Sequence, residues 1–174
     1  MMLAPGLRRL ALTAHIVASV GWLGAVAAFL VLAVVGLASP DASLARSAYA
    51  VLGALARYAI LPLCLAALAT GVLQSLGTVW GLVRHYWVLV KLVITLLSTL
   101  ILLVHLRPIN AIAAIAAAGP IGDGEHLQLR VQLAVAAGLA VLALLLATTL
   151  SVYKPQGLTP YGWRTRHARR TGSR

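Results

Sequence analysis

Acidic side chains are nearly absent from this 174-residue sequence, which has 3 Asp and Glu residues against 14 Lys and Arg residues. Charged residues make up only 10% of the chain and hydrophobic residues 61%, whereas soluble domains carry about 25% charged residues. A soluble core of this size could not hide so much apolar surface. The scarcity of charge therefore excludes an ordinary soluble domain and predicts an integral membrane protein built as one bundle.

Cysteine and methionine are equally scarce. The single cysteine, Cys64, lies inside an apolar run, so the chain has no internal disulfide. Both methionines stand at the start of the sequence, so the soft thioether ligands that Cu(I) prefers are missing from the apolar segments. The net charge of +11 comes from basic residues that flank the apolar runs. We therefore expect them to orient the protein and to meet anionic lipid headgroups, not nucleic acid.

Four apolar runs are long enough to cross a bilayer, which takes about 20 helical residues. We expect transmembrane helices at about residues 10–38, 58–76, 87–106 and 128–152, giving an all-α bundle over residues 1–153. The first run is much longer than the apolar core of a signal peptide, about 7–15 residues, so we interpret it as a span. Residues 42–57 should form an interfacial or protruding start of the second helix, which has a kink at Pro62. The third helix should end at Arg107-Pro108, and residues 110–119 should lie along the surface.

The basic residues predict the orientation of the bundle. Four spans place both termini on one side, together with nine basic residues: Arg8, Arg9, Arg84, Lys154, Arg164, Arg166, Arg169, Arg170 and Arg174. The other side has four: Arg46, Arg57, Arg107 and Arg130. Because cytoplasmic segments carry the excess of Lys and Arg, we expect a multi-pass protein of the inner (plasma) membrane with both termini cytoplasmic. Residues 154–174 would form a basic, flexible cytoplasmic tail near the headgroups.

Two of the expected spans carry a polar stripe. At about 100° per residue, five side chains of the third span fall within a sector of about 80°: Lys91, Thr95, Ser98, Leu102 and His105. The stripe of the first span comprises His15, Ser19, Trp22, Val26 and Phe29. Because lipid cannot solvate polar groups, we expect both stripes to face other helices and the first and third spans to be neighbours.

His15 and Lys91 are the candidate functional residues. Each lies about five residues inside the cytoplasmic end of its span, which places both about 7–8 Å deep. The alternative for His15 is a structural hydrogen bond to a neighbouring helix, and the alternative for Lys91 is a long side chain that reaches the headgroups. Imidazoles and carboxylates at the opposite end could bind Zn²⁺ or Cu²⁺, although their spacing fixes no geometry. These residues are His105, Asp123, Glu125 and His126.

The spacing of these residues resembles known membrane families. His15-x6-Trp22-Leu-Gly24 in the first span and Trp87-x3-Lys91-Leu92 in the third look like the copper-resistance D (CopD) domain. They are also similar to the small haem-containing (HemJ-like) protoporphyrinogen oxidases of bacteria, as is the Lys154-Pro155 end of the last span. A related family of uncharacterised four-helix membrane proteins fits as well. The resemblance covers about residues 8–155.

The resemblance to the oxidases implies a haem site formed by His15 and Lys91. The end of the first span, Ala27-Ala-Phe29-Leu-Val-Leu-Ala33, departs from the oxidase pattern, so the oxidase activity does not carry over with the site. We therefore expect a redox-associated membrane protein that binds haem b, with His15 as ligand to the haem iron. The alternatives are a copper or small-solute permease-like protein and a non-catalytic membrane partner protein. A bis-histidine haem is excluded, because His15 and His105 would lie about 20 Å apart along the membrane normal.

Overall fold

The computed structural model describes residues 4–77, 81–119, 121, 124, 126–155 and 157–164. It contains the α-helices α1 (Pro5–Ala38), α2 (Ala42–Leu55), α3 (Leu61–Gly77), α4 (Tyr86–Ala118) and α5 (Leu127–Tyr153), with a π-helical turn, η1 (Ala56–Ile60), joining α2 to α3. Four continuous helical stretches result, and each is long and apolar enough to cross a membrane. The prediction of an all-α fold with four such helices is confirmed.

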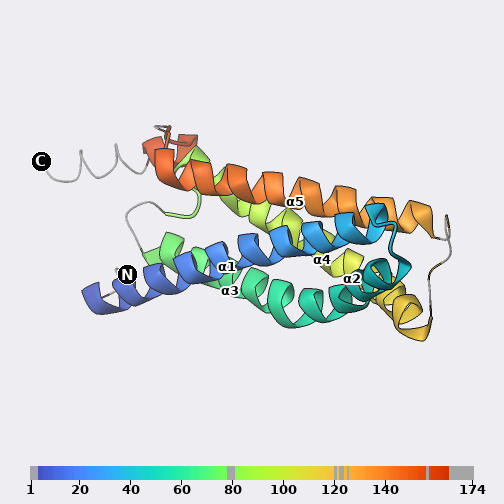
Figure 1. Cartoon of the computed structure of the whole chain (residues 1–174). Helices are drawn as coiled ribbons and strands as arrows, with labels where there is room; N and C mark the ends of the chain where they lie inside the picture. Colours follow the sequence, from blue (N-terminus) through green and yellow to red (C-terminus); the bar gives the residue numbers. More distant parts are fainter. Residues whose placement is uncertain are drawn as a thin grey trace, which may run out of the picture.

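The helices run up and down as a four-cornered bundle (Figure 1). Among the described residues, α1 packs against α5 and against the stretch from α2 to α3, and α4 packs against the same two neighbours. Within the residues that the structure describes, the backbones of α1 and α4 do not meet, so these two helices lie diagonally across the bundle. The expectation that the first and third spans are neighbours is therefore wrong. Short connections make consecutive antiparallel helices adjacent, which leaves the first and third on a diagonal.

The two ends of the bundle differ. The start of α1 and the end of α5 lie together at one end, called here the terminal end; the α1–α2 and α4–α5 connections form the distal end (Figure 1). The described residues of α1 before Ala18 include no buried side chain, whereas six residues between Ala18 and Gly36 are buried. The ribbons of α1 and α3 diverge from those of α4 and α5 toward the terminal end (Figure 1). Apolar packing is therefore concentrated in the middle and distal parts.

The second helical stretch keeps one face on the core by means of its π turn. Buried positions recur at every fourth residue: Leu52, Ala56, Ile60 and Cys64. In a regular α-helix a spacing of four rotates each successive position by about 40°. The wider turn of η1 removes part of that rotation, and its Leu61 N–H bonds back five residues to the Ala56 carbonyl. The expected kink at Pro62 thus takes the form of a π turn just before the proline, which has no N–H to donate.

One predicted boundary differs from the structure. α4 does not end at Arg107-Pro108 but continues through Pro108 to Ala118, because Ile109, Ile112 and Ala116 are buried and hold the distal part in the core. The apolar face that this segment buries outweighs the proline signal that suggested a boundary. Residues 42–57 form the start of the second helical stretch, as predicted, and comprise α2 and the first residues of η1.

Arginine side chains cap two helix ends at the distal end. Arg46 of α2 donates from Nε to the Ala116 carbonyl (2.7 Å) and from a terminal nitrogen to the Ala117 carbonyl (3.0 Å), which are the last carbonyls of α4. Arg130 of α5 donates to the Gly36 carbonyl of α1 at 2.7 Å. Helix C-termini carry unpaired carbonyls and a partial negative charge, so each guanidinium donates hydrogen bonds to the carbonyls and offsets the charge.

Part of the basic tail is ordered at the terminal end. Leu158 forms an antiparallel bridge with His85, and Thr159 donates to the Val83 carbonyl through its buried hydroxyl (2.6 Å). A Cβ at Gly162 would lie 2.4 Å from the Arg84 carbonyl oxygen, so only glycine fits there. Residues 157–164 are therefore packed against the start of α4, in contrast to the flexible tail expected from the sequence. Residues 156 and 165–174 of the predicted tail lie outside the described residues.

Candidate functional site at the terminal end

The stripe of α1 faces the inside of the bundle, as its spacing predicts. Trp22, Val26 and Phe29 are buried in the main core, and His15 and Ser19 are half-buried. The stripe of α4 is half-buried along its whole length, from Lys91 to His105. Because the two helices are diagonal, their backbones do not meet within the described part of the chain.

The orientation of the His15 ring is fixed by α3. Its Nδ1 atom lies 3.1 Å from the Ala67 carbonyl oxygen and 3.1 Å from the Thr70 hydroxyl. A carbonyl only accepts hydrogen bonds, so the bond to Ala67 requires a proton on Nδ1. The lone pair of the neutral ring is then on Nε2, for which the described residues provide no hydrogen-bond partner.

A glycine allows this close approach of His15 to α3. A Cβ placed on Gly71 would lie 3.1 Å from Cε1 of His15, which is tighter than normal packing permits. The carbonyl of Ala67, the hydroxyl of Thr70 and the bare backbone of Gly71 thus line one side of the ring. The three residues lie on one face of α3, because positions three and four residues apart share a face of an α-helix.

The charge of Lys91 is close enough to interact electrostatically with His15, although the backbones of the described parts of α1 and α4 do not meet. The ammonium of Lys91 lies over the ring of Trp87, 5.9 Å from the centroid. Trp87 is one turn nearer the terminal end, so the lysine side chain extends toward that end as a lysine reaching for the headgroups does.

The candidate site residues chosen from the sequence did not include Gln74. Gln74 lies on α3 one turn beyond Thr70, and its side-chain nitrogen is buried without a hydrogen-bond partner among the described residues. The signal was present in the sequence, because Thr70, Gly71 and Gln74 follow helical spacing on one face. Gln74 can be assigned to the His15 site only when α1 is known to pack against α3, and the sequence pattern did not predict that pairing.

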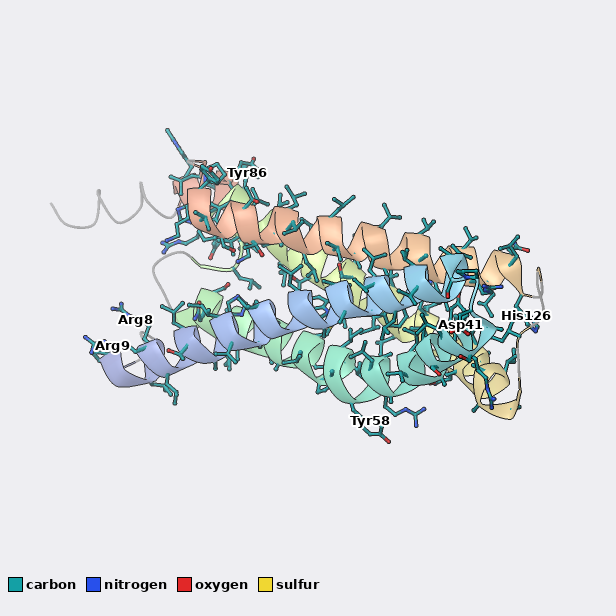
Figure 2. The ribbon with its side chains drawn as sticks, in the orientation of Figure 1. Arg8, Arg9, Asp41, Tyr58, Tyr86 and His126 are labelled. Atoms are coloured by element: carbon teal, nitrogen blue, oxygen red, sulfur yellow. The ribbon has the colours of Figure 1, made fainter. Side chains whose placement is uncertain are left out.

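The other predicted ligands do not join the site. His105 is bonded through Nδ1 to the Ile101 carbonyl of its own helix (2.9 Å) and lies 14 residues, about 21 Å, along α4 from Lys91. His126 is exposed at the distal end (Figure 2), and Asp123 and Glu125 lie outside the described residues. Within the described part of the chain, no three His, Cys, Asp or Glu side chains are grouped so that they could hold a metal ion.

A second polar contact is buried in the middle of the bundle. The Cys64 thiol of α3 lies 3.1 Å from the Thr99 hydroxyl of α4, and both residues are buried. Thr99 also donates to the Thr95 carbonyl at 2.7 Å, so its hydroxyl is satisfied within its own helix. Both groups have partners, and this contact therefore serves to join α3 to α4.

Comparison with known proteins identifies no family for this chain. The chain matches no family model, and neither a curated protein nor a solved structure matches it. The function is therefore argued from the residues at the terminal end.

Proposed function

We propose that this four-helix membrane protein binds a single b-type haem at its terminal end, and that His15 would be the ligand to its iron. The observation that supports the proposal is the hydrogen bonding of the two ring nitrogens of His15. Nδ1 is occupied by the Ala67 carbonyl and Thr70 hydroxyl, whereas Nε2 has no partner among the described residues. Histidines that ligate metals typically donate their other N–H to a carbonyl, which fixes the ring and raises the basicity of the ligating nitrogen.

The surroundings of His15 fit a cofactor that is apolar in its centre and negatively charged at one edge. Lys91 supplies a positive charge that interacts electrostatically with His15. Arg8 and Arg9 project from the start of α1 at the same end (Figure 2), where they could meet carboxylates at the membrane surface. The haem would supply one-electron redox chemistry. The residues of the chain would hold it, set its orientation and balance its charge.

The residues at the terminal end also support a proposal for the cellular location and orientation of the protein. In the sequence, basic residues are more numerous on the side predicted to carry both termini than on the other side, which favours a cytoplasmic terminal end in an inner (plasma) membrane. Tyr86, Tyr153 and Trp163 are exposed at the terminal end, as aromatic side chains at a lipid–water interface are. We infer that this end meets the headgroups of the cytoplasmic leaflet, including anionic ones at the basic tail.

The test is the absorbance spectrum of the purified full-length protein after expression with ample haem. We expect a Soret band that is lost in His15→Ala and retained in His105→Ala, because His105 lies about 21 Å along α4 from Lys91 and therefore outside the proposed site. His105→Ala is the control, because it also replaces a half-buried histidine of a membrane-spanning helix with alanine.

A colourless wild-type protein would exclude the proposal. The permease-like and partner-protein alternatives would then be preferred, because neither requires an imidazole with a free, oriented nitrogen. A copper-uptake assay would distinguish between those two.

A further inference from the structure

The four arginines on the distal side of the bundle form two pairs with different surroundings. Arg46 and Arg130 point inward and donate to helix carbonyls. Arg57 of η1 and Arg107 of α4 are exposed, and neither makes a hydrogen bond or an ion pair with another residue that the structure describes. A guanidinium carries five N–H donors and keeps its charge. Water or a molecule outside the chain must therefore supply the acceptors of this second pair.

Arg57 and Arg107 lie at about the same level of the bundle. The Cys64 thiol of α3 lies 3.1 Å from the Thr99 hydroxyl of α4, and this contact fixes the register of the two antiparallel stretches. Arg57 precedes Cys64 by seven residues and Arg107 follows Thr99 by eight, which are distances of about 11 and 12 Å in the distal direction. A contact farther along agrees with this register, because a Cβ at Gly53 would lie 3.1 Å from a side chain of α4.

The surface between this level and the terminal end is apolar over the thickness of a bilayer, whose hydrocarbon core measures about 30 Å. From Tyr86 to Arg107, α4 advances about 32 Å, and every exposed side chain in between is Val, Leu or Ile. From Tyr58 to Gly77 the second helical stretch advances about 29 Å, and its exposed side chains in between are Pro, Leu or Ala. Tyr58 itself is 77% exposed and is directed away from the bundle (Figure 2), as an aromatic side chain at the lipid–water interface is.

We propose that Arg57 and Arg107 each bind the phosphate group of a phospholipid in the leaflet on the distal side. Their common level coincides with the end of the apolar surface, where the phosphate layer of a bilayer begins. A guanidinium donates two parallel hydrogen bonds to a phosphate and is more weakly hydrated than an ammonium, so it suits this boundary. The occupant is a lipid and not a free phosphate ion, because the apolar surface beside each arginine accommodates the acyl chains of the same molecule. This inference does not depend on the haem proposal.

The test is photo-crosslinking from a position beside each arginine. A photoreactive benzoylphenylalanine replaces Val104, which is 70% exposed and three residues from Arg107, or Tyr58, which adjoins Arg57. The purified full-length protein in a non-ionic detergent receives equal small amounts of phosphatidylglycerol and of the diacylglycerol with the same chains. Mass spectrometry gives the ratio of the two crosslinked lipids. We expect the phospholipid to be enriched about threefold or more at both positions, because the diacylglycerol has no phosphate.

Matched variants assign the enrichment to the two arginines. Arg107→Gln should abolish it at position 104, and Arg57→Gln should abolish it at position 58. The double variant Arg8→Gln, Arg9→Gln removes the same charges from the terminal end and should keep the enrichment at both positions. Enrichment that survives the substitution of the neighbouring arginine would overturn the assignment.

The comparison of the two lipids is decisive even without these variants. Equal crosslinking of phosphatidylglycerol and diacylglycerol in the protein with all its arginines would overturn the proposal, so a variant that does not fold leaves the test intact. An excess of inorganic phosphate should leave the enrichment unchanged. Its loss under that excess would show that the guanidinium groups bind the free ion, and the assignment to a lipid would then be wrong.

Discussion

At the scale of single residues, Tyr49 is an example of close packing at the distal end. This side chain is 0% exposed and its hydroxyl accepts a hydrogen bond from Arg130 at 3.1 Å. The same guanidinium lies 5.3 Å from the centroid of the ring. Gly36 of α1 faces the tyrosine, and a Cβ there would lie 2.6 Å from two ring atoms. A rigid buried ring cannot move aside, so this glycine is required by packing.

We therefore expect Gly36→Ala to destabilise the protein by about 1–3 kcal/mol, the usual cost of overpacking a core. The measurement is thermal unfolding in detergent, followed by circular dichroism. Gly24→Ala is the matched control on the same helix, because a Cβ at Gly24 meets nothing within 4 Å. The control should be neutral or slightly stabilising, since alanine favours a helix interior more than glycine. Equal effects of the two substitutions would contradict the role assigned to Gly36.

At the scale of elements, the distal end of α4 depends on a side chain from another helix. Its C-terminal residue is followed by Gly119, whose N–H returns to the Ile115 carbonyl. The carbonyls of Ala116 and Ala117 are bound by Arg46 of α2. Since Pro108 removes one backbone donor inside α4, the turns beyond it rely on burial against α2 and on this cap.

The Arg46→Gln variant should therefore loosen the last turn of α4. We expect backbone amides of residues 113–118 to exchange hydrogen for deuterium about three- to tenfold faster, as expected for loss of about 1 kcal/mol of capping. Arg107→Gln is the control, because it removes the same charge from an exposed position of α4. Unchanged exchange in Arg46→Gln, or equal acceleration in both variants, would show that the cap does not hold this turn.

At the scale of the whole molecule, the number of spans, their class and the two inward-facing stripes could be predicted from the sequence. Apolar length and helical spacing are local properties, so they are visible without a partner. The pairing of His15 with Thr70 could not be predicted, because it depends on which helices become neighbours. The predicted end of α4 at Pro108 was wrong for a related reason: Ile112 and Ala116 find their burial on α2, far away in the sequence.

Orientation in the membrane is also a property of the whole molecule. From the excess of basic residues at the terminal end, we expect both termini in the cytoplasm. A reporter active only outside the cytoplasm should work when fused after Gly124, in the α4–α5 connection, and should be silent when fused to the C-terminus. A reporter active only in the cytoplasm should give the opposite pattern. Activity of the external reporter at the C-terminus would reverse the assignment.

The length of α1 has a thermodynamic consequence. Its 34 residues span about 51 Å, whereas the hydrocarbon core of a bilayer is about 30 Å thick. We expect the surplus to stand in water at the distal end, where Tyr49, Leu52 and Ile112 are fully buried. One continuous core would then be surrounded by water in its distal part and by lipid in the rest. Burial from water changes the heat capacity and weakens on cooling, but helix packing within lipid has no such driving force. Cold should therefore loosen the distal part first and leave the membrane-embedded helices in place.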